Sequence, residues 1–496
     1  MKKRILNIMI VVLAIAALTL TACGGGGGVV APSAPSNVDA AAGEGLITIT
    51  WDPVNGASSY TVFRSTTMGD GKAGTATSVT GTPYVHEKLV YGTDYYYVVT
   101  AVNAAGESAP SAEVSNTPDR LPIANITFSD SNLGTCVSDY SIAFNFTYAD
   151  ELISLGCSSR GISDLTGIDW LTALTALALY SNTISDVSPL ANLTALTYLE
   201  LYSNTISDVS PLANLTALTH LGLSANTISD VSPLANLTAL ITLNLSSNTI
   251  SDVSPLADLT ALTGLFLGSN TISDVSPLAN LTALTRLALY SNTISDVSPL
   301  ANLTALTSLY LYFNTISDVS PLANLTALTR LNLYSNTISD VSPLAKLTSL
   351  TWLTLGSNTI SDVSPLANLT SLTWLNLGSN TISDVSPLAN LTALEWLYLN
   401  SNEISDVSLL ANLTALTYLD LRFNTISDVS PLANFTALQY LYLDDNLITI
   451  GVSALTPLLN AVTIVFTGNN SIPCADLNTL EAALGADIVT RPLSCT

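Results

Sequence analysis

Few side chains of this chain could take part in catalysis or hold a metal ion. Its 496 residues contain two histidines, His86 and His220, and neither has a catalytic or metal-binding partner at the spacing of a known motif. General acid–base and nucleophilic catalysis need such partners within hydrogen-bonding reach. No hydrolase, phosphate-loop or zinc-protease motif occurs either. We predict a protein that is not an enzyme and has no cofactor or metal, with His220 exposed to solvent.

Aspartate recurs at a fixed spacing and carries much of the negative charge. The formal net charge is −24, from 37 acidic and 13 basic residues, and one aspartate recurs every 22 residues from Asp186 to Asp428. Each follows a serine and precedes V-S and then proline or leucine, which favours turn capping. Binding of a cation to this column is the alternative. The lack of a basic patch argues against nucleic acid as a partner.

Aromatic side chains gather at equivalent places in the sequence. Trp352, Trp374 and Trp396 stand 22 residues apart, and Tyr418 and Tyr440 continue that spacing. The same and neighbouring repeat positions also hold the other residues that we predict to bind a ligand: Tyr310, Tyr312, Arg330, Tyr334, Tyr398, Arg422 and Tyr442. Clustered, exposed aromatic rings usually mark recognition surfaces. The alternative is that the rings stabilise one another as cross-strand neighbours.

The element that must position these side chains is a 22-residue repeat. From Ala173 to about Asp445 the chain reads T-A-L-T-x-L-x-L-x-S-N-T-I-S-D-V-S-P-L-A-N-L with few exceptions. An L-x-L pattern before an asparagine at this period is typical of a leucine-rich repeat solenoid. Leu177 and Leu179 alternate as core residues of a strand, and Pro189 predicts a short 3₁₀ turn. We therefore predict a concave parallel sheet with a 3₁₀ or irregular convex side.

The sequence of the repeat resembles that of the internalins, a family of bacterial surface proteins. Their repeats are also 22 residues long and contain a similar S-D-I-S-P-L-A-N-L-T run, and the resemblance covers roughly residues 125–470. It implies a non-catalytic binding surface. The ends depart from the family, which usually has a C-terminal immunoglobulin-like region and a wall-anchoring tail. Invasion of host cells is therefore not carried over.

The N-terminus has the features of an export signal. Lys2-Lys3-Arg4 precede an apolar run, and residues 1–22 are predicted to be a signal peptide. Leu20-Thr21-Ala22-Cys23 resembles the lipobox of bacterial lipoproteins, which implies that Cys23 carries the lipid. Gly24 in place of aspartate favours the outer membrane. Ordinary cleavage beside an incidental cysteine is the alternative.

The segment before the repeats resembles a fibronectin type III domain. The residues that carry the resemblance are Trp51, Gly92-Thr93-Asp94-Tyr95 and the run from Val102 to Ser108. Trp51 is expected in the core of an all-β sandwich. The predicted domains are a lipidated, glycine-rich tether at 23–34, the sandwich at 35–118, an N-terminal cap with a first degenerate repeat at 119–161, repeats at 162–469 and a C-terminal cap at 470–496.

The remaining cysteines flank the repeats. Cys136 and Cys157 stand near the start, and Cys474 and Cys495 near the end. Because an exported protein meets an oxidising compartment, we predict one disulfide in each cap, with free buried thiols as the alternative.

These features together predict an exported, lipid-anchored protein of the outer membrane or cell surface. It would bind a protein or glycan partner through the concave aromatic face, in adhesion or interaction with the envelope, and contact the membrane through its lipid. A structural spacer and a carbohydrate-binding module without catalysis are the alternatives.

Overall fold

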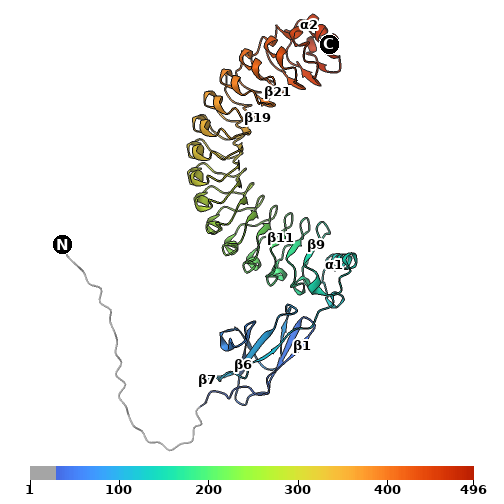
Figure 1. Ribbon diagram of the computed structural model, residues 1–496, viewed down its shortest axis with the longest axis vertical. Coiled ribbons are helices and arrows are strands. Elements are labelled where there is room, and N and C mark those ends of the chain that lie inside the picture. The colour runs from blue at the N-terminus through green and yellow to red at the C-terminus, as the bar shows by residue number, and fades with distance from the viewer. Residues whose placement is uncertain (1–28, 496) are drawn as a thin grey trace, which may run out of the picture. The chain divides into compact units, whose positions relative to one another are not determined.

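The computed structural model describes residues 29–495, which form two units (Figure 1). The first comprises residues 29–87 and 92–118, and the second comprises residues 88–91 and 119–495. Cys23 and the rest of the predicted export signal lie outside the described residues.

The first unit is an antiparallel β-sandwich. One sheet has the order β1-β2-β5, and the other has the order β4-β3-β6-β7 with β8 also pairing with β6. The strands are β1 (Asp39–Gly43), β2 (Leu46–Thr50), β3 (Ser59–Ser65), β4 (Thr75–Val79), β5 (Tyr84–Glu87), β6 (Tyr95–Asn103), β7 (Gly106–Glu107) and β8 (Val114–Asn116). Trp51 is buried and packs against the ring of Tyr60 at 5.2 Å, as expected for a core residue.

A neutral histidine is buried in this sandwich. His86 Nδ1 lies 2.7 Å from the hydroxyl of Tyr97, and Nε2 lies 2.5 Å from Nη1 of Arg64. The guanidinium can only donate, so Nε2 must accept. Burial, and then the charge of Arg64, lower the pKa of His86 to about 4. The neutral form is therefore held in the folded state.

Mild acid is expected to destabilise the sandwich through His86. Because the pKa is lower in the folded state, the unfolded chain binds the proton first, and stability falls as pH drops from about 6.5 towards 4. From pH 7 to pH 5 the loss is about 2 kcal/mol. Urea unfolding followed by hydrogen exchange in β6 should show this loss in the wild type and a smaller one in His86→Gln. Equal slopes against pH would contradict the assignment.

The second unit is built around one parallel sheet, which runs in unbroken chain order from β9 to β24. Its strands are β9 (Ser154–Gly156), β10 (Ala176–Ala178), β11 (Tyr198–Glu200), β12 (His220–Gly222), β13 (Thr242–Asn244), β14 (Gly264–Phe266), β15 (Arg286–Ala288), β16 (Ser308–Tyr310), β17 (Arg330–Asn332), β18 (Trp352–Thr354), β19 (Trp374–Asn376), β20 (Trp396–Tyr398), β21 (Tyr418–Asp420), β22 (Tyr440–Tyr442), β23 (Thr463–Val465) and β24 (Val489–Thr490).

The repeats stack their leucines into one continuous core. In β16, for example, Leu309 is fully buried, and Leu311 just after the strand is buried as well. Proline is the second residue of the short 3₁₀ turns opposite the sheet, from η5 (Ser188–Leu190) to η14 (Ser386–Asn390) and again in η16 (Ser430–Asn434). Figure 1 shows the solenoid as an arc with the sheet inside and these turns outside. The concave face is therefore the sheet.

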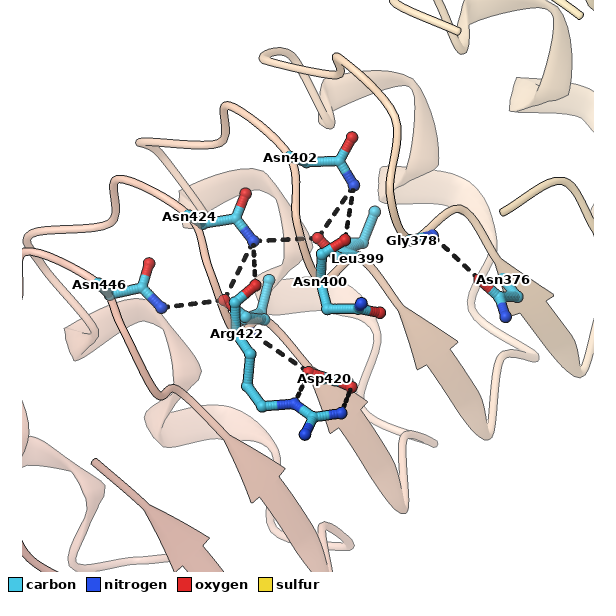
Figure 2. A network of polar contacts seen from close by, with 10 residues as sticks. Asn376, Gly378, Leu399, Asn400, Asn402, Asp420, Arg422, Asn424 and Asn446 are labelled. Carbon is cyan, nitrogen blue, oxygen red and sulfur yellow. Dashed lines mark hydrogen bonds and ion pairs between the residues drawn. The ribbon is translucent and has the colours of Figure 1, made fainter. Parts of the chain in front are cut away.

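An asparagine ladder ties each repeat to the one before it. Asn204 donates from Nδ2 to the carbonyls of Leu179 and Leu201, at 3.1 and 3.0 Å, and its Oδ1 accepts from the backbone of Ile184 at 3.0 Å. Figure 2 shows part of this pattern further along the chain, where Asn402 and Asn424 both donate to the carbonyl of Leu399. These bonds satisfy backbone groups that the strands leave unpaired inside the core.

A helix and a disulfide close each end of the solenoid. Asp130 caps the N-terminus of helix α1 (Ser131–Phe144), and its carboxylate accepts from two backbone N–H groups of the first turn. Cys136 in α1 is bonded to Cys157, and Cys474 at the start of α2 (Cys474–Leu484) is bonded to Cys495. The two predicted disulfides are confirmed. Strand β24, which extends the sheet beyond the degenerate repeat, was not foreseen. The predicted fold class is confirmed for both units.

Candidate ligand-binding face

Three positions of each repeat face out of the concave sheet. In β18 they are Trp352 and Thr354, on either side of the buried Leu353, and Gly356 after the buried Leu355. Alternation along the strand makes this arrangement obligatory, because the two leucines must point into the core. All the predicted binding residues occupy such positions, and the structure places them on one surface.

The three tryptophans form one column across adjacent strands. Trp352 pairs with Trp374 in the register of β18 and β19, and Trp374 pairs with Trp396 in that of β19 and β20. Tyr418 and Tyr440 extend the column on β21 and β22. We call these five residues the aromatic ladder.

The rings of the ladder stack on one another. The centroid of Trp396 lies 4.9 Å from those of Trp374 and Tyr418, with interplanar angles of 19° and 14°. The Trp352–Trp374 and Tyr418–Tyr440 pairs are looser, at 6.5 and 6.1 Å. Since the tight spacing matches the separation of neighbouring strands, the inner rings turn their faces to each other. Their edges remain to meet a partner.

Tyr398 and Tyr442 form a second aromatic row beside the ladder. The ring of Tyr398 lies 4.7 Å from that of Tyr418 and 5.4 Å from that of Trp374. Tyr442 lies 5.5 Å from Tyr418. Burial among these rings, followed by the neighbouring Tyr398 and Asp420, raises the pKa of Tyr418. The Tyr418 phenol therefore stays protonated and can donate a hydrogen bond near neutral pH.

Arg422 is held by an aspartate of its own repeat. Asp420 is 1% exposed and accepts from Nε of Arg422 at 2.9 Å, from Nη2 at 2.6 Å and from the backbone N–H at 3.2 Å (Figure 2). The guanidinium also lies 5.3 Å from the ring centre of Tyr442. The charge of Arg422 is therefore paired within its own repeat.

Two asparagines next to the ladder carry free amide groups. Asn376 Oδ1 accepts from the backbone of Gly378 at 3.0 Å (Figure 2). Its amide nitrogen, and both ends of the Asn400 side chain, have no hydrogen-bond partner among the described residues. Gly356 and Gly378 leave room for these amides, because a Cβ at either position would lie within 3 Å of Asn376 or Asn400. Hydrogen-bonding groups thus border the aromatic rings.

A second aromatic group lies further toward the N-terminus. The ring of Tyr312 stacks on that of Tyr290 at 4.6 Å, and Phe313 touches Tyr312 and Tyr334 edge-on. Tyr310 reaches across to Trp352 at 6.4 Å. Sequence reasoning missed Phe313, although the signal was present, because other repeats have mostly serine at this position.

The prediction for His220 was wrong. Its Nε2 lies 2.7 Å from Oε1 of Glu200, and its ring stacks on Tyr198 at 4.5 Å, so the side chain is half-buried. Glu200 comes from the preceding strand, and the glycine at position 222 leaves space for its carboxylate. The pairing across strands, which the linear sequence hides, removes His220 from free solvent.

The aspartate column caps the convex turns. Asp208 accepts from the backbone N–H of Ser210 at 2.8 Å and from its hydroxyl at 3.0 Å. These two bonds, the backbone one first, lower the pKa of Asp208. Within residues 29–495 no group of three or more histidine, cysteine or acidic side chains is arranged to hold a metal ion. In the same range no helix is both long and apolar enough to cross a membrane.

Known families match both units of the chain. The leucine-rich repeat region family matches residues 173–450, and the fibronectin type III domain family matches residues 33–117. An internalin from Listeria monocytogenes is 41% identical with a TM-score of 0.63, over 65% of this chain and 97% of that one. The functional domain of InlJ from the same organism is 27% identical with a TM-score of 0.56, over 68% and 80% of the two chains.

Curated relatives share only a short segment. An amylopullulanase from Thermoanaerobacterium saccharolyticum is 34% identical over 79 residues, which are 16% of this chain and 6% of the enzyme. Across the curated relatives, the matched segment spans between 4% and 13% of the relative's own length. Those enzymes therefore say nothing about an activity here. From the repeats and the internalin match, the chain belongs to the leucine-rich repeat family as an internalin-like protein with a fibronectin type III domain.

Proposed function

We propose that this chain is an exported, membrane-anchored lipoprotein that binds a protein partner through its concave face, in adhesion or interaction with the envelope. The predicted export signal and Cys23 support the anchor. The repeat family and the internalin match support a binding role. The aromatic ladder carries the assignment of the site, because large rings on a rigid sheet offer contact area at little entropic cost.

The stacking of the rings favours a protein over a glycan. Sugars pack on the open faces of aromatic rings, whereas Trp396 has both faces covered by Trp374 and Tyr418. What the ladder presents is a row of ring edges with free amides at Asn376 and Asn400 beside them. Such a surface suits apolar side chains and backbone carbonyls of a protein, which is the pairing common at interface cores.

The spacer alternative assigns the rings a purely stabilising role. Stacked pairs contribute about 0.5–1.5 kcal/mol each beyond their burial, so stability and recognition both involve the ladder. A useful test must therefore measure binding in a variant that is shown to be folded.

The test is partner capture from envelope and environmental extracts by the full chain and by Trp352→Ala/Trp374→Ala/Trp396→Ala. The matched control is Tyr180→Ala/Tyr202→Ala, which removes another stacked concave pair, at 4.4 Å, far from the ladder. We expect capture by the wild type and the control, and binding at least about a hundredfold weaker in the tryptophan variant. Equal capture by a folded tryptophan variant would remove the ladder from the site.

A further inference from the structure

Charge is segregated between the two sides of the solenoid. The aspartate column lies on the convex turns, while the outward concave positions of β12 through β20 contain no acidic residue at all. The nearest concave carboxylates, Glu200 on β11 and Asp420 on β21, are bonded to His220 and Arg422. The centre of the concave face is thus free of negative charge in a chain whose net charge is −24.

Two arginines in this acid-free stretch have no partner. Arg286 and Arg330 are exposed, and among the described residues neither side chain makes a hydrogen bond or ion pair. The other arginines of the same unit are paired: Arg120 with Asp150, Arg160 with Asp139, Arg422 with Asp420 and Arg491 with Glu481. The whole chain has 37 acidic residues and 13 basic ones, yet these two guanidiniums have no carboxylate partner. We take this to indicate that a binding partner supplies their counter-charge.

The two arginines stand at equivalent positions two strands apart. Arg286 pairs in register with Ser308, and Ser308 pairs with Arg330. Two strand spacings put their Cα atoms about 10 Å apart. The short Ser308 lies between them, and the in-register neighbours on their far sides are Gly264 beside Arg286 and Trp352 beside Arg330.

Aromatic residues follow the strands of this stretch: Tyr312 and Phe313 come after β16, and Tyr334 comes after β17. Phe313 is 50% exposed and has a φ of 54°, the left-handed region that a bulky side chain rarely adopts. Serine fills this position in most repeats, so the fold does not require phenylalanine there. The ring of Phe313 contacts Tyr312 and Tyr334. Because half of this side chain is exposed, packing in the core does not explain why phenylalanine stands here.

We propose that Arg286, Arg330, Tyr312, Phe313 and Tyr334, which we call the basic–aromatic segment, bind an acidic, extended segment of the protein partner. This inference rests on the proposed function and names the chemistry of the partner. Arginine pairs with carboxylates through charge-assisted bonds, and the aromatic residues take the apolar side chains between them. A polyproline II segment with an acidic residue at every third position fits, since its equivalent side chains repeat about every 9 Å on one face.

The test measures binding of a synthetic peptide of repeated Glu-Pro-Pro to the full chain in detergent, at low salt and at about 0.15 M salt. The same peptide with glutamine in place of glutamate is the probe control. Arg286→Gln/Arg330→Gln is the variant. Lys346→Glu, at an exposed lysine on the convex turn η12 (Ser342–Lys346), changes the net charge by the same amount and is the matched control.

We expect the glutamate peptide to bind the wild type and Lys346→Glu alike, more weakly at higher salt, and to bind the arginine variant at least about tenfold more weakly. Absence of binding at low salt, or equal binding to the arginine variant, would overturn the inference. Arginine-dependent binding of polygalacturonate without peptide binding would also overturn it, in favour of an acidic glycan. Because the tryptophans are intact in these variants, failure here leaves the test of the aromatic ladder unaffected.

Discussion

Replacing Asn292 by alanine is expected to destabilise the solenoid by about 3–5 kcal/mol. The side chain donates to the carbonyls of Leu267 and Leu289, both at 3.0 Å, and accepts from the backbone N–H of Ile272 at 2.9 Å. Alanine would leave the Ile272 N–H unpaired inside the core, which costs about 1–3 kcal/mol. The two carbonyls keep one bond each, from Asn270 and Asn314, so each lost bond to a carbonyl adds about 1 kcal/mol. Urea denaturation followed by circular dichroism measures the loss.

Ser295→Ala is the control for this substitution. Ser295 is exposed in the same turn, and the expected change in the free energy of unfolding is within about 0.5 kcal/mol. If the Asn292 variant unfolds at the same urea concentration as this control, the asparagine ladder does not hold the repeats together.

Removing the N-terminal disulfide is expected to cost more than removing the C-terminal one. Each bond joins cysteines separated by 21 residues, so loop closure in the unfolded chain contributes about 3 kcal/mol in both cases. Cys136 and Cys157 are also buried in the core, whereas Cys474 is exposed and Cys495 is half-buried. Truncation at the N-terminal pair therefore adds a cavity, and with it a further loss of about 1–2 kcal/mol.

The double variants Cys136→Ala/Cys157→Ala and Cys474→Ala/Cys495→Ala test this difference. Because the two loops are equally long, comparing the variants separates the effect of burial from that of loop entropy. Thermal unfolding should show the larger decrease for the N-terminal variant. An equal or reversed order would mean that the first cap does not depend on the buried bond.

The periodic features of this molecule could be read from the sequence. Leu177 and Leu179 alternate within a repeat, so their burial follows from the geometry of a strand alone. An asparagine recurs after each repeat strand, as at Asn182, so the asparagine ladder could be anticipated. The cysteines flank the repeats, so both cap disulfides could be anticipated as well. Residues that are the same in every repeat are those that pack each repeat against its neighbours, and this requirement is the same for every repeat.

The sequence does not predict which side chains on the concave face contact each other. Arg422 and Arg330 both stand at outward concave positions, yet Arg422 is bound to Asp420, while the Arg330 side chain has no hydrogen bond or ion pair among residues 29–495. His220 finds Glu200 across strands, and the rings near Trp396 turn edge-outward because their neighbours cover their faces. Strand β24 lies beyond the last recognisable repeat, where periodicity no longer guides prediction.

The most direct test of the central claim, that the concave aromatic face binds a protein, is photo-crosslinking from single positions. A benzophenone amino acid at Tyr398, beside the ladder, should crosslink to the partner in extracts. The same group at Asn324, exposed on the convex turn η11 (Ser320–Asn324), should not. Crosslinking from Asn324 alone, or equally from both positions, would contradict the assignment of the partner to the concave face.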